Sequence, residues 1–418
     1  MPIASRQFRR ILRNTALALL VMVMGLGLGR GPARADKLLD ETVDLTGTIL
    51  YLESKVPGMV IGVIRNGETS VRGFGKIADG SDKEPDGDTL MRIGSITKVF
   101  CGATLASMVA DGTVSFTDRL QDRIGWDVKI PQRDGKEIRL IDLATHASGL
   151  PREAEGRPGE DATAERSKED YVTSLTGPDV LLFAPGTGVL YSNFGFDMLA
   201  QGLATAGGKP YPELLKERVL DPAGLKDTRF DLSDADKART MQGHNFDSSP
   251  MPFVPTSPLI VGAGGLYSTA NDMLRWLGWH LDRFSSKEAE MRLLDQAVYL
   301  DRDGLNPAFG MDEGGEMDAM GLGWVVMRPE GPRPLIMHKS GGLQGQFSFV
   351  AMAPSRGVGV FVSMNEFSVA GFDAMAKTTL ELITELANRY PRQISLRLRA
   401  TWRPRSAPRR SPRRRARP

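Results

Sequence analysis

Ser95 and Lys98 have the types and the spacing that acyl-transfer chemistry requires, and they open the run S-I-T-K-V-F-C-G-A. Residues three positions apart lie on one face of a helix. A serine hydroxyl becomes a strong nucleophile when a base takes its proton, and a neutral lysine is such a base. Burial or a second cation lowers a lysine pKa enough for this role. Ser95 is therefore a candidate nucleophile and Lys98 its candidate base.

Two later motifs carry groups that assist such chemistry: Y-S-N at Tyr191 to Asn193, and K-S-G at Lys339 to Gly341. The S-x-x-K motif alone is expected about once by chance in a chain of this composition. An ordinary N-cap serine followed by an exposed lysine is therefore an alternative. The three motifs together are expected only about 0.02 times, before their order and spacing are considered.

The elements around these motifs predict how they are positioned. Ser95 is expected to open an apolar helix that ends near Asp111-Gly112, with the backbone N–H groups of its first turn favouring negative charge. Y-S-N follows Pro185-Gly186 and is expected in a loop, whereas K-S-G is expected at the end of a strand.

Strand patterns near both ends of the chain predict the fold. Residues 58–77 form two strand-like runs joined by Asn66-Gly67, a strong hairpin signal, and further strands are expected between 321 and 364. Helices are expected over 37–54 and 369–389. The predicted α+β fold is one antiparallel sheet flanked by the terminal helices, with a mainly helical inserted lobe. The sheet lobe takes about residues 36–95 and 320–390, the helical lobe about 96–319, and a cleft between them is the expected site.

The two ends of the chain differ from the body in composition. Residues 1–35 have basic residues, a short apolar stretch and the site Ala33-Arg34-Ala35, which predict an export signal cleaved after Ala35. An uncleaved membrane anchor is the alternative, although the apolar stretch is shorter than the roughly 20 residues of a span. Residues 391–418 are rich in arginine and proline and are expected to be disordered. This segment either binds an anionic surface or is a solvated extension without a role.

Charge and cysteine content exclude several function classes. The end segments hold 17 arginines and no acidic residue, so residues 36–390 keep 36 basic against 51 acidic residues, a net charge of −15. An acidic body repels phosphate backbones, so nucleic-acid binding by the main domain is not expected. Cys101 is the single cysteine and the four histidines have no metal-ligand spacing, so we expect no disulfide scaffold, metal or other cofactor. Cys101 itself is expected in the core.

The three motifs resemble those of the penicillin-recognising serine enzymes, and tyrosine in the middle motif is similar to the class C β-lactamase branch. The runs L-A-T-H-A-S-G-L-P-R-E, Y-S-N-F-G-F-D-M-L-A and G-L-G-W-V-V-M-R-P further resemble AmpH-type periplasmic D-alanyl-D-alanine carboxypeptidase/endopeptidases. The similarity covers roughly residues 50–390. It implies a β-lactamase/transpeptidase-like fold.

The resemblance also implies a role for each matching residue. Ser95 would be acylated, Lys98 and Tyr191 would share its proton, and Tyr191 would pass the proton to the leaving amine. The implied binding groups serve the substrate amide, the carboxylate and the oxyanion. They are Asn193 for the amide, Lys339, Ser340 and Gly341 of the strand motif for the carboxylate side, and the N–H groups of Ser95 and Gly342 for the oxyanion. Ser340 stands where the family usually has threonine and keeps the hydroxyl.

The resulting expectation is an exported serine hydrolase that acts on D-Ala-D-Ala or D-Ala-linked peptidoglycan peptides and is acylated by β-lactams. A β-lactamase and a carboxylesterase use the same residues, so both stay open as alternatives. An alternative of another class is a non-catalytic peptidoglycan-binding factor. Nucleic-acid binding through the arginine-rich tail is a further alternative, with a steep dependence on salt.

Overall fold

The computed structural model describes residues 33–34, 37–155, 167–177, 179–283 and 285–389. The predicted export signal lies outside these residues except for 33–34, and the predicted arginine-rich tail lies wholly outside them.

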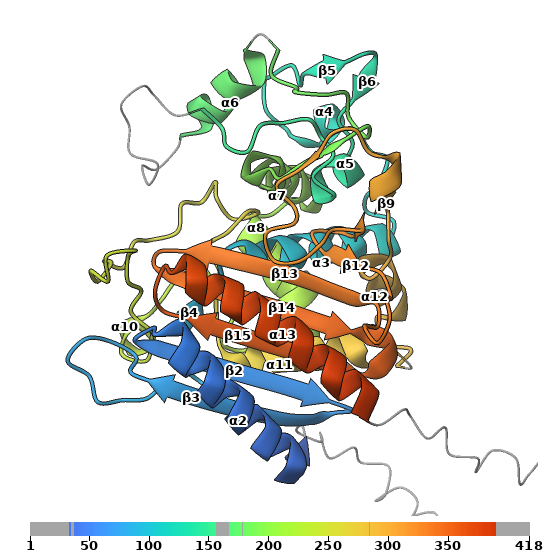
Figure 1. The fold of residues 1–418 in the computed structure, drawn as a ribbon. Coiled ribbons are helices and arrows are strands. Elements are labelled where there is room, and N and C mark those ends of the chain that lie inside the picture. The colour runs from blue at the N-terminus through green and yellow to red at the C-terminus, as the bar shows by residue number, and fades with distance from the viewer. Residues whose placement is uncertain (1–32, 35–36, 156–166, 178, 284, 390–418) are drawn as a thin grey trace, which may run out of the picture.

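A nine-stranded sheet forms the centre of the molecule, in the order β1-β3-β2-β15-β14-β13-β12-β11-β9 (Figure 1). Every pairing is antiparallel except that of β1 with β3. The strands are β1 Ala33–Arg34, β2 Gly58–Arg65, β3 Glu68–Gly75, β9 Leu300–Asp301, β11 Ala319–Met320, β12 Val325–Met327, β13 Ile336–Leu343, β14 Gln346–Ala353 and β15 Val358–Met364. Because β15 pairs with β2, strands from the two ends of the chain are neighbours in the middle of the sheet.

The predicted hairpin is present as β2 and β3. Asn66 and Gly67 both have positive φ angles, 50° and 88°, as a two-residue turn of this kind requires. The turn sets the register, in which Arg65 pairs with Glu68 and Gly58 with Gly75.

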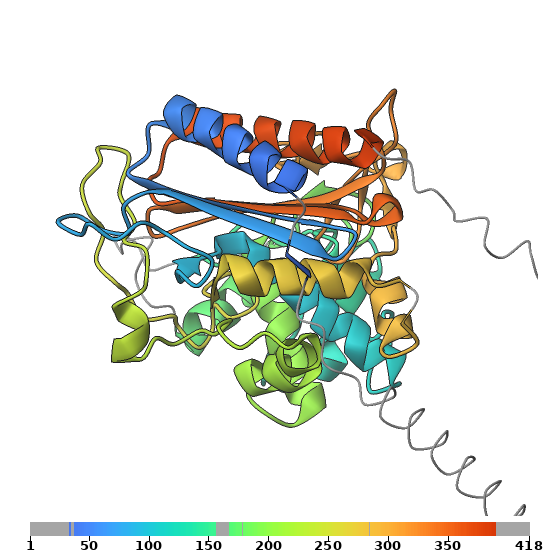
Figure 2. The same ribbon diagram turned by 90° about the horizontal axis from the view of Figure 1, so that it is seen from below.

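The terminal helices α2 (Lys37–Ser54) and α13 (Val369–Arg389) lie side by side on one face of the sheet (Figure 2). Their apolar side chains, such as Leu50 and Ile383, are buried in a core shared with β2, β14 and β15. This arrangement confirms the predicted packing of the terminal helices on the sheet.

The opposite face is covered by α11 (Ala270–Leu281), which comes from the inserted segment (Figure 2). Two glycines allow its close approach. A Cβ atom at Gly62 would lie 3.1 Å from Leu274, and one at Gly359 would lie 3.1 Å from Leu277. The sheet is therefore buried on both faces, by the chain ends on one side and by the insertion on the other.

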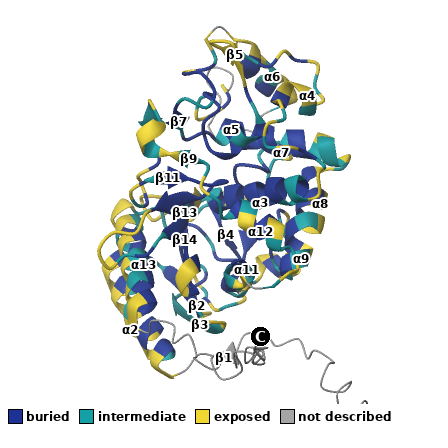
Figure 3. Cartoon of the chain, turned by 90° about the vertical axis from the view of Figure 1, so that its right-hand side faces the viewer, coloured by how far each residue is buried: buried dark blue, intermediate teal, exposed yellow. Residues whose placement is uncertain are grey.

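The inserted segment is mainly helical, and α3 (Thr97–Ala110) runs through its centre, where Figure 3 shows it largely buried. Cys101 on α3 is fully buried, which confirms its predicted place in the core. The other helices are α4 Leu120–Arg123, α5 Leu140–Ala144, α6 Lys168–Thr176, α7 Asn193–Gly207, α8 Tyr211–Leu215, α9 Asp221–Ala223, α10 Asp234–Lys237 and α12 Ala289–Asp295.

Short elements connect the helices and the sheet. The 3-10 and π turns are η1 Gly94–Ile96, η2 Lys216–Leu220, η3 Arg302–Gly304 and η4 Pro354–Arg356. Three two-stranded pairs lie outside the main sheet: β4 Met91–Arg92 with β8 Tyr267–Ser268, β5 Gln132–Arg133 with β6 Lys136–Glu137, and β7 Val189–Leu190 with β10 Ala308–Phe309.

Among the helices in the described part of the chain, none is both long enough and apolar enough to cross a membrane.

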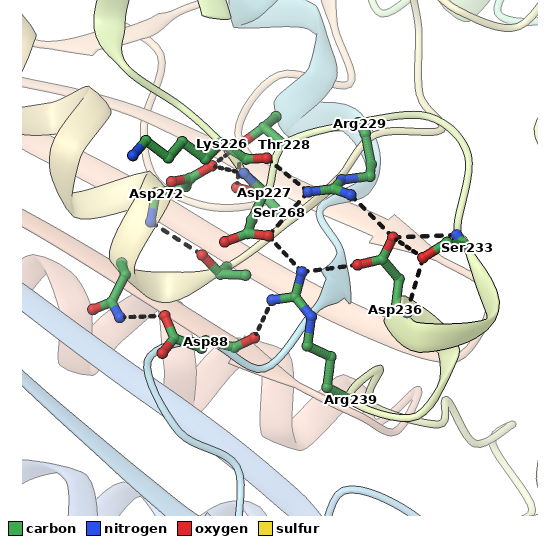
Figure 4. Close-up of polar contacts among 12 residues, drawn as sticks. Asp88, Lys226, Asp227, Thr228, Arg229, Ser233, Asp236, Arg239, Ser268 and Asp272 are labelled. Atoms are coloured by element: carbon green, nitrogen blue, oxygen red, sulfur yellow. Dashed lines mark hydrogen bonds and ion pairs between the residues drawn. The ribbon is translucent and has the colours of Figure 1, made fainter.

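Four charged side chains, Asp227, Arg229, Asp236 and Arg239, form a network beside α10 that we call the arginine–aspartate cluster (Figure 4). Arg229 contacts Asp227 at 2.9 Å and Asp236 at 3.0 Å, and Arg239 contacts Asp236 at 2.8 Å and also pairs with Asp227. Arg239 also donates to the carbonyl oxygen of Asp88 at 2.8 Å. The cluster thus ties the α10 segment to the loop that precedes β4.

Candidate active site

Ser95 lies in the turn η1, which continues directly into α3. The predicted helix is present, with Asp111 as its C-cap. The one-turn spacing brings Lys98 back toward Ser95, so that Lys98 Nζ lies 3.1 Å from Ser95 Oγ. Lys98 is fully buried, which differs from the alternative of an exposed lysine.

The Y-S-N motif contributes two side chains to the same point. Tyr191 donates its hydroxyl hydrogen to Ser95 Oγ at 2.6 Å. Lys98 Nζ donates to Asn193 Oδ1 at 2.6 Å and to the carbonyl oxygen of Ala263 at 2.7 Å. The first two sequence motifs therefore meet at the Ser95 hydroxyl.

The Y-S-N motif joins β7 to α7 rather than lying wholly in a loop. Ser192 is the N-cap of α7: its Oγ accepts from Gly195 N at 2.8 Å and donates to the Pro151 carbonyl at 2.6 Å. Asn193 is consequently the first residue of the helix. His146 Nδ1 accepts from Ser192 N at 3.0 Å, and its ring stacks on Tyr191 at 4.7 Å between centroids. The helix cap and His146 together fix the direction of the tyrosine.

The K-S-G motif lies inside β13, whereas the sequence placed it at the end of a strand. The strand continues through Gly342 and Leu343 and turns at Gln344 and Gly345, which both have positive φ. The continuation pairs Gly342 with Phe347 of β14. The glycines after Ser340 favoured a strand end in the sequence. In the structure the strand continues through them, and their lack of side chains lets another backbone segment approach the strand closely.

That segment is the η1 turn. A Cβ atom at Gly341 would lie 2.0 Å from the Ile93 carbonyl oxygen and 2.9 Å from Ser95 N. A Cβ atom at Gly94, whose φ is +50°, would lie 2.6 Å from Gly342 N. The backbones of η1 and β13 are thus in direct contact, which places the N–H groups of Ser95 and Gly342 in adjoining segments.

Burial determines the electrostatics of Lys98. Removal from water lowers its pKa to about 7, although the carboxylates of Asp197 and Glu153 act in the opposite direction. Asp197 accepts hydrogen bonds from Ala263 N at 2.9 Å and from Tyr171 Oη at 2.9 Å, and burial raises its pKa. The carbonyl of Ala263 accepts a hydrogen bond from Lys98, and its N–H donates to Asp197. Ala263 therefore links the amine of Lys98 to the carboxylate of Asp197.

Three basic side chains surround the Tyr191 ring. Lys98 Nζ, Arg152 Cζ and Lys339 Nζ lie 4.8, 4.7 and 5.1 Å from its centroid. Burial lowers the pKa of Lys339. Burial, reinforced by the charges of these basic side chains, also holds the pKa of His146 well below its usual value, so His146 is neutral. The phenol oxygen therefore lies in a region of positive potential that favours charge developing on it.

A cavity of about 540 Å³ opens onto these groups. Its lining includes Ser95 and Tyr191, the strand residues Lys339 to Gly342, and Arg152 and Glu313. It therefore adjoins both the sheet and the inserted segment, where the cleft was predicted. Among the residues that the structure describes, no group of three or more His, Cys, Asp and Glu side chains is placed to hold a metal ion.

The chain is similar to known proteins over most of its length. The family model described as Beta-lactamase matches residues 35–385. The chain belongs to the beta-lactamase family. It is 32% identical over 364 residues to D-alanyl-D-alanine-carboxypeptidase/endopeptidase AmpH of Escherichia coli (strain K12), which covers 86% of this chain and 92% of that protein. Like its family, this beta-lactamase family member is a serine hydrolase.

Solved structures of the beta-lactamase family share the fold. The Beta-lactamase/D-alanine Carboxypeptidase from Yersinia pestis, complexed with citrate, has a TM-score of 0.75 and 33% identity, covering 84% of this chain and 99% of that one. A class C beta lactamase from Rhodobacter sphaeroides has a TM-score of 0.67 and 23% identity, covering 83% and 99%. The second comparison supports the fold alone, and both agree with the α+β architecture predicted from the sequence.

Three charged residues at the site were not predicted from the sequence of this family member: Arg152, Glu153 and Asp197. Glu153 accepts a hydrogen bond from Asn193 Nδ2, and Arg152 lies over the Tyr191 ring. Both end the run H-A-S-G-L-P-R-E, whose charges gave the available signal. Asp197 follows Asn193 by four positions on α7, a spacing that places both on one helix face.

Proposed function

We propose that this protein is an exported D-alanyl-D-alanine carboxypeptidase/endopeptidase that cleaves peptidoglycan peptides through an acyl-enzyme on Ser95. The observation that carries the proposal is the double contact on Ser95 Oγ, from Tyr191 Oη at 2.6 Å and Lys98 Nζ at 3.1 Å. A hydroxyl held between two groups that can exchange its proton is the arrangement of an activated nucleophile.

Lys98 is the proposed base for acylation. A lysine whose pKa is about 7 is half neutral at that pH, so it can take a proton that an ordinary lysine cannot. Tyr191 contacts Ser95 Oγ and lines the same cavity, and it is the proposed donor to the leaving amine. As Ser95 Oγ bonds to the substrate carbonyl carbon, its proton passes through the Lys98–Tyr191 pair to the amine nitrogen, and the C–N bond breaks.

The oxyanion formed during acylation is proposed to bind the N–H groups of Ser95 and Gly342, which the contact of η1 with β13 brings together. Each such donor is typically worth about 10²- to 10³-fold in rate. Water then attacks the acyl-enzyme, the Lys98–Tyr191 pair accepts its proton, and Ser95 regains a hydrogen as the ester bond breaks.

The proposed substrate class rests on Lys339 and Ser340, which line the cavity and can bind a carboxylate. Lys339 and Ser340 are proposed to bind the free carboxylate of a D-alanyl-D-alanine peptide, with Gly341 allowing backbone approach and Asn193 binding the substrate amide. Similarity to a protein named D-alanyl-D-alanine-carboxypeptidase/endopeptidase supports this choice. β-Lactams carry a carboxylate beside a reactive carbonyl and are proposed to acylate Ser95 in the same way.

The proposed location is the periplasm, with cleavage after Ala35 leaving a hydrolase domain over residues 36–390. Support comes from the basic and apolar pattern of residues 1–35. The arginine-rich segment 391–418 is proposed to contact anionic surfaces of the envelope, because its charge is opposite to theirs.

The test combines three reagents with the purified mature protein and its Ser95→Ala variant: a fluorescent penicillin, a chromogenic β-lactam and crosslinked muropeptides. Intact mass measures the adduct, and chromatography measures released D-alanine and cleaved crosslinks. We expect an adduct that requires Ser95, together with loss of D-alanine from the muropeptides.

Fast turnover of the chromogen with untouched muropeptides would replace the proposal by a β-lactamase. Muropeptide binding without an adduct or turnover would replace it by a non-catalytic binding factor.

A further inference from the structure

Four phenylalanines whose rings lie close to one another line the cavity, and we call them the aromatic wall: Phe246, Phe347, Phe367 and Phe372. The ring of Phe347 lies 5.0 Å from that of Phe367 and 5.2 Å from that of Phe372, and Phe246 lies 5.4 Å from Phe367. All four line the cavity that contains Ser95.

The wall is assembled from three segments far apart in the sequence. Phe347 belongs to β14, Phe372 to the first turn of α13, and Phe246 to the segment before α11. The last segment is held to the sheet by backbone bonds from His244 N to the carbonyls of Asn365 and Gly345, at 2.9 and 3.2 Å. In Figure 1 the arrow of β13 ends on the side of the sheet where α13 begins, and Phe372 belongs to the first turn of that helix.

The wall begins directly beside the reacting centre. A Cβ atom at Gly342 would lie 2.8 Å from Phe347 and 3.9 Å from Phe367. Gly342 carries one of the two proposed oxyanion donors. An apolar group attached close to a carbonyl at Ser95 would therefore contact these rings.

Packing of the core does not account for the whole wall. Phe246 is 65% exposed and Val369, which lines the same cavity, is also 65% exposed. An apolar surface that is open to water and continuous with a reactive serine gains free energy when it is covered by an apolar group. The same cavity is also lined by the basic residues Lys339 and Arg152 and by the acidic residues Glu313 and Asp373, so an apolar surface and charged groups face one cavity.

We propose that the aromatic wall is a subsite for an aryl group carried by the substrate near its reactive carbonyl. The subsite widens the substrate class from small D-alanyl peptides to aryl-substituted acyl donors. The proposal rests on Ser95 as the nucleophile of the proposed function, and its aryl preference is separable from peptidase activity.

Boronic acids test the wall without any turnover, because they bond reversibly to an active serine. Benzylboronic acid and methylboronic acid are titrated into the full mature protein, with Phe246→Ala and Phe246→Tyr alongside. Phe253→Ala is the matched control, since Phe253 is 47% exposed in the same segment but does not line the cavity.

We expect benzylboronic acid to bind at least about tenfold more tightly than methylboronic acid, the gain typical of burying an aromatic ring. Phe246→Ala should lower the logarithm of the benzyl-to-methyl affinity ratio by at least a third, whereas Phe246→Tyr and Phe253→Ala should leave that ratio unchanged. Equal affinities for the two boronates, or an equal loss of preference in Phe253→Ala, overturns the subsite.

Peptides then identify which part of the substrate carries the aryl group. N-phenylacetyl-D-Ala-D-Ala has it on the acyl side and N-acetyl-D-Ala-D-Phe on the leaving side, with N-acetyl-D-Ala-D-Ala as reference. A higher kcat/KM for either aryl peptide supports the subsite on that side, and equal values for all three overturn it for peptides. If no peptide releases an amino acid but the boronate preference depends on Phe246, the peptidase proposal fails and the subsite stands.

Discussion

The active-site residues and the arginine–aspartate cluster are both networks of mixed charge, but they use charge in opposite ways. In the cluster each arginine meets two carboxylates (Figure 4). Burial alone would raise the pKa of Asp236, yet hydrogen bonds from Ser233 and Arg239 and the charge of Arg229 lower it to about 2. At the active site, the hydrogen-bond partners of Lys98 among the described residues are the neutral oxygens of Ser95, Asn193 and Ala263.

The charges of the cluster are paired and stabilise the fold, whereas Lys98 has no carboxylate bonded to it in the described part of the chain and is proposed to take part in the reaction. Paired charges keep their ionised forms and hold segments together, because losing a proton or a partner costs free energy. Lys98 is buried and donates to the carbonyl oxygen of Ala263, whereas the Asp197 carboxylate accepts from the N–H of the same residue. Its ammonium form therefore lacks the direct partner that would hold the proton, which is the condition for a base.

Replacing Lys98 by methionine should produce the largest effect. We expect the rate of Ser95 acylation to fall about 10²- to 10⁴-fold, the usual contribution of a general base. The melting temperature is measured alongside, because methionine has a similar volume but leaves the oxygens of Asn193 and Ala263 without their donor. Arg239→Met is the matched control and should lower the melting temperature while acylation continues. A Lys98→Met enzyme with normal acylation kinetics would remove lysine from the mechanism.

Asp236→Asn should weaken the cluster in a pH-dependent manner. The folded-state pKa of about 2 lies below the ordinary value of 3.8, so the charge of Asp236 stabilises the fold above about pH 4 and ceases to do so as the pH falls toward 2. The variant should lose about 2 kcal/mol of unfolding free energy at pH 7. Urea titrations at pH 7 and pH 2.5 check this, and a loss of equal size at both pH values would contradict it.

Asp197→Asn should move the pH profile of the active site. The acid limb of kcat/KM is expected near pH 7, because Lys98 gains a proton below its pKa. The Asp197 carboxylate raises that pKa, so the asparagine variant should keep its activity to lower pH. Tyr171→Phe removes only a hydrogen bond that holds the carboxylate ionised, and should cause a smaller shift in the same direction. Lower rates with an unmoved limb would indicate a structural role alone.

The sequence predicted the parts of this molecule that depend on local pattern. The Asn66-Gly67 hairpin, the helix that follows Ser95 and both terminal helices are present because turn chemistry and periodicity act over a few residues. The single antiparallel sheet covered by the terminal helices was predicted from the need to bury these faces against one another, whereas the strand order was not predicted. The K-S-G motif was misplaced at a strand end, since two glycines conceal the continuation of β13 that contact with η1 requires.

Pairings across the fold were beyond local pattern. The packing of α11 on the second face of the sheet was not predicted from the sequence. Gly62 and Gly359 make room for Leu274 and Leu277, and this contact is visible only in the folded structure. Asp197 was missed for the same reason. An aspartate on a helix is usually exposed to solvent. Asp197 is buried because the fold brings Ala263 against it, and the N–H of Ala263 donates to its carboxylate.

Ser340→Thr should give the smallest effect and tests how the carboxylate is bound. Threonine keeps the hydroxyl, and its extra methyl would lie near Gly314, which has no side chain. We expect kcat/KM for a D-Ala-D-Ala peptide to stay within about threefold, whereas Ser340→Ala should lose about tenfold or more, as for a hydrogen bond to a charged group. Repeating both variants on the same peptide with a C-terminal methyl amide should remove the difference, because that substrate has no carboxylate. If kcat/KM of Ser340→Ala and Ser340→Thr differs by the same factor on both substrates, Ser340 supports the structure of the strand and does not bind the carboxylate.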